Sequence, residues 1–221
     1  MTIEPSGEYR ESYHDLVRWD VIPYIPKSGG QLLDVGGGVG ATAFALRENG
    51  VADKVGVVDM VSHENSAIKL DYAFQGNLED PALLKRIKAE RGTFQTILAL
   101  DILEHLVDPW KIITGLEDLL APKGYLVASI PNIRNYQALM PLFLRNSWNY
   151  QDAGILDRTH LRFFVRETAE SLISNAGLKI TNVVGSPTGG RKVRLFRQIT
   201  FGLLNSFTDR QYVIVGQKSD G

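Results

Sequence analysis

The chain has 221 residues, of which 44% are hydrophobic and 22% charged, a composition typical of one globular domain. Its formal net charge of −1 gives no overall attraction for nucleic acid, which is therefore not an expected partner. The sequence contains no cysteine, and this excludes disulfides, thiolate–zinc sites and a cysteine nucleophile.

Residues 1–30 are predicted to form a helical lead-in ahead of the main fold. Residues 1–16, MTIEPSGEYRESYHDL, are polar and lack the apolar core of a signal peptide. No stretch of the sequence approaches the ~20 apolar residues that a membrane-spanning helix needs. We therefore expect a cytoplasmic location.

From residue 31 to residue 130, short apolar runs alternate with helical stretches. The predicted strands are residues 31–35, 54–60, 73–77, 94–100 and 124–130. The predicted helices are ATAFALREN (41–49), SHENSAIKLDY (62–72), DPALLKRIKAE (80–90) and PWKIITGLEDLL (109–120). Repeated strand–helix units whose strands are almost continuously apolar indicate a parallel, doubly wound α/β sheet.

The alternation breaks after Pro131. The elements predicted beyond it are a long aromatic segment (132–164), a helix (165–177) and two closing strands (178–186 and 211–218). The stretch 187–210 between these strands is too long for a tight hairpin, whose loops usually have ~2–5 residues. We expect residues 1–221 to form a single domain.

The stretch LLDVGGGVG (32–40) predicts a ligand site. An apolar strand carrying Asp34 runs directly into a glycine-rich turn, where a ligand can approach the backbone without clashing with Cβ atoms. Asp59 closes the next predicted strand and can accept hydrogen bonds from a ribose diol. Up to this point the pattern fits NAD as well, since Gly36, Gly38 and Ala41 match a relaxed dinucleotide fingerprint.

The acid Asp34 favours a different ligand. A buried carboxylate would repel a pyrophosphate, whereas it would stabilise a ligand that carries an ammonium and a sulfonium group. S-adenosyl-L-methionine is such a ligand, and its carboxylate could meet the N–H groups of the following helix. An NAD-dependent oxidoreductase remains the alternative.

Three segments resemble the signatures of class I S-adenosylmethionine-dependent methyltransferases, in the correct order. Residues 34–40, DVGGGVG, are similar to the first signature, D/E-x-G-x-G-x-G. LDILEHLVDP (100–109) and LAPKGYLVASIPN (120–132) are similar to the second and third. The resemblance implies a Rossmann-like, doubly wound, seven-stranded mixed sheet whose last strand is antiparallel. It also implies that residues 132–164, after strand five, are an inserted acceptor-binding segment.

The resemblance implies which residues hold the cofactor. The first signature would bind the methionine part, the acid after strand two the ribose, and residues after strands two, three and four the adenine and the sulfonium side. An asparagine at position 77 departs from the acid that the family often has there. The implied cofactor-binding residues are Asp34, Gly36, Gly37, Gly38, Gly40, Asp59, Met60, Asn77, Leu78, Leu100, Asp101 and Ile102.

The acceptor is predicted from the segment that follows strand five. The block WNYQDAGILDRTHLRFF (148–164) resembles methyltransferases that are encoded among glycosyltransferases in bacterial surface-polysaccharide clusters. This resemblance implies O-methylation of a sugar or glycan precursor. The residues expected to contact the acceptor are Arg134, Tyr150, Arg158 and His105.

His160 is the predicted catalytic base, because an imidazole has a suitable pKa for accepting a hydroxyl proton, and Asp157 would orient it. The alternative is that Asp157, Arg158, His160 and Arg162 form a structural ion network that anchors the loop. No metal is expected, since the sequence shows no acid-rich cluster.

Two other functions remain open. One is methylation of a small metabolite of the quinone or polyketide type, because DILEHLVDP (101–109) is equally typical of such enzymes. The other is a non-catalytic module that binds the cofactor without turnover.

The segment 187–210 is predicted to be a basic amphipathic insertion. Within it, RKVRLFRQITFGLLNSF (191–207) places apolar residues at helical spacing beside four basic ones. One interpretation is a lid or a homodimer contact packed on the domain. The other is a peripheral contact with the inner face of the membrane.

Overall fold

The computed structural model describes residues 16–64, 66–187 and 189–220. Its strands are β1 (Gln31–Val35), β2 (Lys54–Asp59), β3 (Tyr72–Gln75), β4 (Phe94–Leu100), β5 (Leu120–Pro131), β6 (Lys179–Pro187) and β7 (Asp209–Gln217). Its α-helices are α2 (Ala41–Glu48), α3 (Pro81–Arg91), α4 (Pro109–Leu119), α5 (Tyr136–Arg145), α6 (Arg166–Ser174) and α7 (Arg191–Ile199). Short 3₁₀ turns occur at η1 (Ile22–Tyr24), η2 (Leu103–His105) and η3 (Asn205–Phe207).

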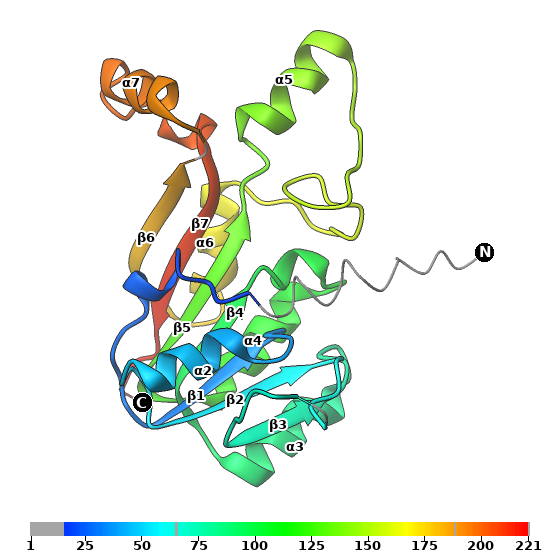
Figure 1. The fold of residues 1–221 in the computed structure, drawn as a ribbon, viewed down its shortest axis with the longest axis vertical. Coiled ribbons are helices and arrows are strands. Elements are labelled where there is room, and N and C mark those ends of the chain that lie inside the picture. The colour runs from blue at the N-terminus through cyan, green and yellow to red at the C-terminus, as the bar shows by residue number, and fades with distance from the viewer. Residues whose placement is uncertain (1–15, 65, 188, 221) are drawn as a thin grey trace, which may run out of the picture.

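The seven strands form one mixed sheet in the order β3-β2-β1-β4-β5-β7-β6 (Figure 1). β7 runs antiparallel to both of its neighbours, and the other pairings are parallel. The seven-stranded, doubly wound sheet predicted from the sequence is confirmed. The strand order reverses between β1 and β4, and in such sheets ligands bind beyond the carboxyl ends of the strands at this point.

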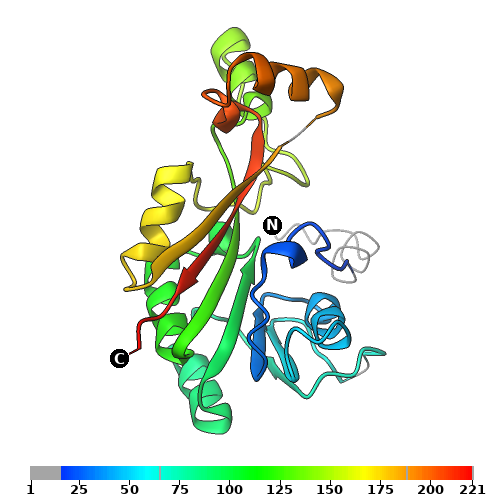
Figure 2. The same ribbon diagram turned by 90° about the vertical axis from the view of Figure 1, so that its left-hand side faces the viewer.

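Helices cover both faces of the sheet (Figure 2). One face packs against α3, α4 and α6 in the larger core, and the other packs against α2 and the segment around η1. Adjacent residues of β1 divide between the two cores, Leu33 entering the first and Leu32 the second. This two-sided burial explains why the strands read as continuous apolar runs.

Local signals set the start of several helices. The Asp80 carboxylate accepts a hydrogen bond from the Ala82 N–H at 2.9 Å, and Pro81 stands at the first position of α3, where it loses no helical bond. Asp108 caps α4 in the same way, with a 3.0 Å bond from the Lys111 N–H. These capping bonds fix the residue at which each helix begins after the loop that precedes it.

The helix predicted over residues 62–72 is wrong. The described residues between β2 and β3 form turns and bends. The hydroxyl of Ser62 accepts a hydrogen bond from the Glu64 N–H, and that of Ser66 accepts one from the Ile68 N–H. Such local bonds compete with helical ones, and serine is a weak helix former.

Two helices project from one end of the sheet, α5 from the segment after β5 and α7 from the connection between β6 and β7 (Figures 1 and 2). Their bases are tied together by the amides of Asn132 and Asn135. Asn132 donates to the backbone oxygens of Ser206 and Asp209 at 2.7 and 2.8 Å, and Asn135 donates to that of Asp209 at 3.0 Å. The segments that carry α5 and α7 are therefore joined at their base, which we call the shared root.

Half of the predicted N-terminal helical lead-in, residues 1–15, lies outside the described part. The described remainder of that segment contains the single turn η1. Among the helices of the described residues, none has the length and apolarity needed to cross a bilayer.

Candidate active site

The turn after β1 has the shape of a ligand cradle. Gly36, Gly38 and Gly40 all have positive φ angles, of 71°, 57° and 80°, which side chains rarely tolerate. A Cβ atom at Gly37 would lie 2.5 Å from the carboxyl carbon of Asp34. The backbone can therefore fold close over Asp34 only because these positions lack side chains.

Substitution at Gly37 tests this cradle. Gly37→Ala is expected to weaken S-adenosylhomocysteine binding by about tenfold or more, because the added methyl displaces the Asp34 carboxyl group. Calorimetric titration measures the change. The matched control is Gly190→Ala, where an added Cβ meets nothing within 4 Å. Equal affinity in the two variants would contradict the cradle.

Asp34 is buried in β1, with only 2% of its surface exposed. Burial and the nearby Asp59 carboxylate raise the pKa of Asp34 to about 7, while the Arg18 guanidinium opposes the shift. An approaching cationic group stabilises the ionised form of such a carboxylate. The environment fits the ammonium and sulfonium groups of S-adenosylmethionine.

Asp59 lies at the end of β2, next to the glycine turn. One of its carboxylate oxygens accepts a hydrogen bond from the Gly38 N–H at 2.8 Å, and the other accepts one from the Val61 N–H at 2.9 Å. These bonds hold the carboxylate beside the turn, and each oxygen keeps a second lone pair for a ribose hydroxyl. The two acids that the sequence separates by 25 positions thus flank one turn.

The end of β4 borders the same turn. The Ile102 side chain occupies the space beside Gly36, where a Cβ would come within 2.8 Å of it. Asp101 has a positive φ of 51° and accepts a hydrogen bond from the Ser129 hydroxyl at 2.7 Å. Its other oxygen pairs with the guanidinium of Arg18, a residue that belongs to no motif recognised in the sequence.

The structure places the residues predicted to border the adenine in different surroundings. Met60 is largely exposed after β2, and Gln75 donates a hydrogen bond to its backbone oxygen at 3.1 Å. The Asn77 side chain accepts a hydrogen bond from the Glu79 N–H at 3.0 Å. The Leu78 side chain, by contrast, lies in the larger hydrophobic core, and its place beside the adenine stays a prediction.

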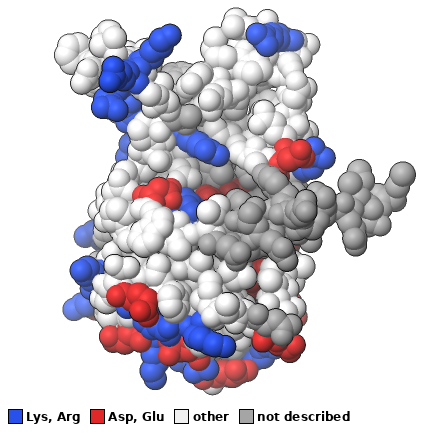
Figure 3. Space-filling model, in the orientation of Figure 1, with Lys and Arg blue, Asp and Glu red and all other residues white. Residues whose placement is uncertain are grey.

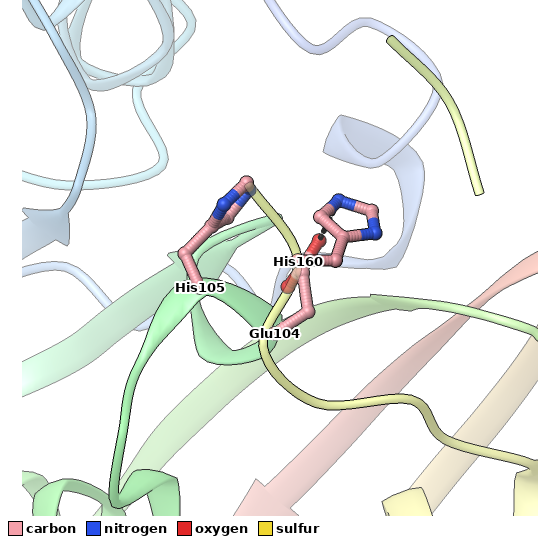
Figure 4. Close-up of side chains that lie close together, drawn as sticks. All are labelled: Glu104, His105 and His160. Atoms are coloured by element: carbon pink, nitrogen blue, oxygen red, sulfur yellow. Dashed lines mark ion pairs between the residues drawn. The ribbon is translucent and has the colours of Figure 1, made fainter. Parts of the chain in front are cut away.

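Glu104, His105 and His160 meet beside the end of β4 (Figure 4). Two come from η2 and the third from the segment after α5, and one ligand atom of each lies within 4.8 Å of the others. The imidazole rings meet edge to face, with centroids 4.7 Å apart. The backbone oxygen of Glu104 accepts hydrogen bonds from the N–H groups of Leu161 and Arg162, at 2.8 and 3.0 Å, and so holds the segment after α5 against η2.

His160 is turned into the protein. Its Nδ1 lies 3.1 Å from the Ile155 carbonyl oxygen, which can only accept, so Nδ1 carries the proton and Nε2 faces Glu104 at 3.9 Å. Burial and His105 lower the pKa of His160. Burial and Asp101 raise the pKa of Glu104, whose carboxyl oxygens accept no hydrogen bond from the described residues. Both shifts favour the neutral form of the group.

His105 is the more exposed imidazole of the cluster. Its Nδ1 lies 3.1 Å from the Thr159 hydroxyl, and that hydroxyl donates to Asp157 at 2.6 Å. The hydroxyl must then accept from Nδ1–H, which leaves the lone pair of the neutral ring on Nε2. Asp157 orients His105 through Thr159, and its side chain makes no hydrogen bond to His160 among the described residues.

The four predicted acceptor contacts do not converge. Arg158 is exposed and forms an ion pair with Asp152, and Tyr150 is exposed. The guanidinium of Arg134 lies 4.4 Å from the ring centroid of Phe207. Arg134 also lines a cavity of about 590 Å³ between α6, β7 and the segment after α7, which the residues of the cofactor turn do not line. Of the four, His105 alone belongs to the Glu104 cluster, and contact of Arg134 with the acceptor stays a prediction.

The same cluster could hold a divalent cation, since two imidazoles and a carboxylate are a common ligand set for transition metals. The sequence offered no signal for this arrangement, because Glu104 and His160 are far apart in the chain and no His/Glu spacing motif joins them.

A model of the methyltransferase domain family matches residues 7–183. The chain belongs to this methyltransferase family. Its fold is also that of solved S-adenosylmethionine-dependent methyltransferases. One from Archaeoglobus fulgidus aligns with a TM-score of 0.62 at 17% identity, covering 95% of this methyltransferase and 94% of that chain. One from Mesorhizobium loti aligns with a TM-score of 0.60 at 14% identity, covering 90% and 97%.

Curated relatives of this methyltransferase are named ubiquinone biosynthesis O-methyltransferase. The protein of Psychrobacter arcticus is 29% identical over 167 residues, which are 72% of this chain and 62% of the relative. That of Psychrobacter cryohalolentis is 33% identical over 111 residues, which are 48% and 42%. The methyltransferase thus spans less than two thirds of these relatives. The comparisons confirm the predicted methyltransferase domain and its cofactor, S-adenosyl-L-methionine; they name ubiquinone rather than polysaccharide biosynthesis.

Proposed function

We propose that the chain transfers the methyl group of S-adenosylmethionine to a hydroxyl of a small aromatic acceptor of the quinone type. The observation that carries this proposal is the imidazole–carboxyl cluster at the end of β4, directly after the residues that border the glycine turn. It supplies a proton acceptor next to the cofactor cradle.

The acceptor class rests on two supports. The curated relatives are named for ubiquinone biosynthesis and O-methylation. The acceptor segment also presents aromatic and apolar side chains beside the cluster: the Trp148 and Phe163 rings meet edge to face at 5.6 Å, and the His160 and Phe163 rings lie 6.4 Å apart. A flat aromatic molecule packs favourably against such rings.

Hydroxyl acidity favours the same class. A phenol has a pKa of about 10, which is much closer to the pKa of an imidazole than the pKa of a sugar hydroxyl is. A single neutral histidine can therefore assist a phenol more effectively. These supports favour the quinone-type acceptor over the sugar acceptor predicted from the sequence.

The chain's own groups have three tasks in this reaction. S-adenosylmethionine, when bound, supplies a methyl group on a positively charged sulfur, and the acceptor oxygen displaces that sulfur. Asp34 and Asp59 hold the cofactor, so that the methyl and the oxygen meet at near-attack distance. His105 Nε2 accepts the hydroxyl proton, and Asp157, acting through Thr159, steadies the resulting imidazolium.

The roles of the two histidines are thereby exchanged relative to the sequence prediction. His160 Nε2 faces the buried Glu104 carboxyl group and His160 Nδ1 is held by a backbone carbonyl, so neither nitrogen is offered to an acceptor. We assign His160 to positioning the acceptor segment.

The acceptor class is tested by supplying two sets of compounds to the purified chain and measuring S-adenosylhomocysteine release. A dihydroxybenzoate and a hydroxylated benzoquinol form the first set, and UDP- and dTDP-linked sugars form the second. We expect turnover with the first set and none with the second. The reverse result would restore the glycan acceptor, and cofactor binding without turnover on either set would favour a non-catalytic module.

A further inference from the structure

The projecting ends of the molecule, residues 133–150 around α5 and residues 189–207 around α7, share a distinctive surface. Much of the exposed large apolar surface of the described residues gathers here, with Phe201 and Leu203 exposed by 90% and 85%. The large exposed side chains of this end are Tyr136, Met140, Leu142, Phe143, Leu144, Tyr150, Leu195, Phe196, Ile199, Phe201, Leu203 and Leu204. We call this surface the α5–α7 tip.

The charge of the α5–α7 tip has one sign. Residues 133–150 and 189–207 contain no aspartate or glutamate. Their basic residues are Arg134, Arg145, Arg191, Lys192, Arg194 and Arg197. Figure 3 shows blue and white atoms at this end of the visible face, with red atoms gathered further down the molecule.

Most of these cations are available to a partner. Arg197 pairs with Asp209, and Arg134 stacks on Phe207. Arg145, Arg191, Lys192 and Arg194 are exposed and form no ion pair with any described residue. In a chain with 24 basic and 25 acidic residues, such segregation leaves a locally positive, apolar end.

We infer that the α5–α7 tip binds the surface of an anionic lipid bilayer, with its apolar side chains entering the interface and its cations contacting lipid phosphates. Interfacial helices combine these two features, a basic polar side and exposed phenylalanine and leucine. Each basic residue near an anionic leaflet adds to the attraction. The shared root at Asn132 and Asn135 lets both helices approach one surface together.

Charge complementarity selects a bilayer over a second copy of this chain. A symmetric dimer through this surface would bring the same cations of both copies together without any acid to neutralise them. An anionic bilayer supplies the missing negative charge. Binding there would also bring the active site to where an apolar quinone is dissolved, and only this last consequence rests on the proposed function.

The test is co-sedimentation of the purified chain with vesicles, which requires no turnover. We expect the chain to pellet with vesicles of phosphatidylcholine and phosphatidylglycerol, and far less with pure phosphatidylcholine. Binding to the anionic vesicles should weaken as salt is raised. Arg191→Glu with Lys192→Glu should lower partition onto the anionic vesicles by about tenfold or more. Phe201→Ser with Leu203→Ser should lower it by about tenfold, and their exposure spares the fold.

The matched control is Lys85→Glu with Lys88→Glu, two exposed positions on α3 at the opposite end of the molecule (Figure 1). It changes the net charge equally and should leave partition unchanged. A wild-type chain that stays in the supernatant overturns the inference, as does an equal loss in the α3 control. A dimer that dissociates in the Phe201/Leu203 variant, without vesicle binding, would also overturn it and make the tip a contact between copies.

Discussion

Asp34→Asn is expected to weaken binding of S-adenosylmethionine by about 10²-fold while making the free chain harder to unfold at pH 8. The carboxylate is buried, and burial and Asp59 oppose its ionisation more strongly than Arg18 favours it. Removing that charge removes the attraction for the cofactor's cationic groups, and charged hydrogen bonds of this kind contribute about 1.5–3 kcal/mol each. Calorimetric titration with S-adenosylmethionine and S-adenosylhomocysteine measures the loss.

The stability gain follows from the direction of the pKa shift. The native pKa of Asp34 is about 7, whereas the unfolded value is 3.8. Between these values the native chain holds more protons than the unfolded chain, so the free energy of unfolding falls as the pH rises from about 4 to 7. The penalty is fully present above pH 7, and Asp34→Asn removes it.

The melting temperature of Asp34→Asn should therefore exceed that of the wild-type chain at pH 8. The two melting temperatures should be similar at pH 4, where Asp34 is protonated. The exposed Asp118→Asn is the matched control and should change neither stability nor affinity. Wild-type affinity for S-adenosylmethionine should also rise with pH through about 7, as Asp34 ionises. A pH-independent affinity, or an Asp34→Asn chain that binds normally, would contradict the role of Asp34.

His105→Ala is expected to lower kcat by about 10²–10⁴-fold, the usual cost of losing a general base, with affinity for S-adenosylhomocysteine unchanged. Added imidazole should restore part of the rate in the variant, which a merely structural defect would not allow.

His160→Ala separates the two imidazoles. It should lower the melting temperature, because it removes the ring that contacts Ile155 and Glu104. A larger loss of kcat in His160→Ala than in His105→Ala, at unchanged melting temperature, would return the base to His160. A wild-type rate that falls in EDTA and recovers with Mn²⁺ would mean that Glu104, His105 and His160 hold a metal ion.

Short-range patterns determined most of the fold and the cofactor side of the site. The glycine turn at 36–40 needs left-handed backbone angles that few residues tolerate, and Asp80 and Asp108 cap their helices through bonds to residues two or three positions away. Continuous apolar strands alternating with helices admit few topologies other than a parallel sheet. That order then brings Asp34 and Asp59 to one edge of the sheet.

Tertiary structure alone decided the acceptor side. Glu104 and His160 meet because the segment after α5 folds back and donates two backbone hydrogen bonds to η2, a path that no local pattern in residues 132–164 encodes. Arg134, which precedes α5, lies at a separate cavity beside β7, and Arg158 pairs with Asp152. Side-chain partners across such a distance depend on how the whole insertion packs, whereas strand periods and caps depend on near neighbours, and only the latter can be read from the sequence by itself.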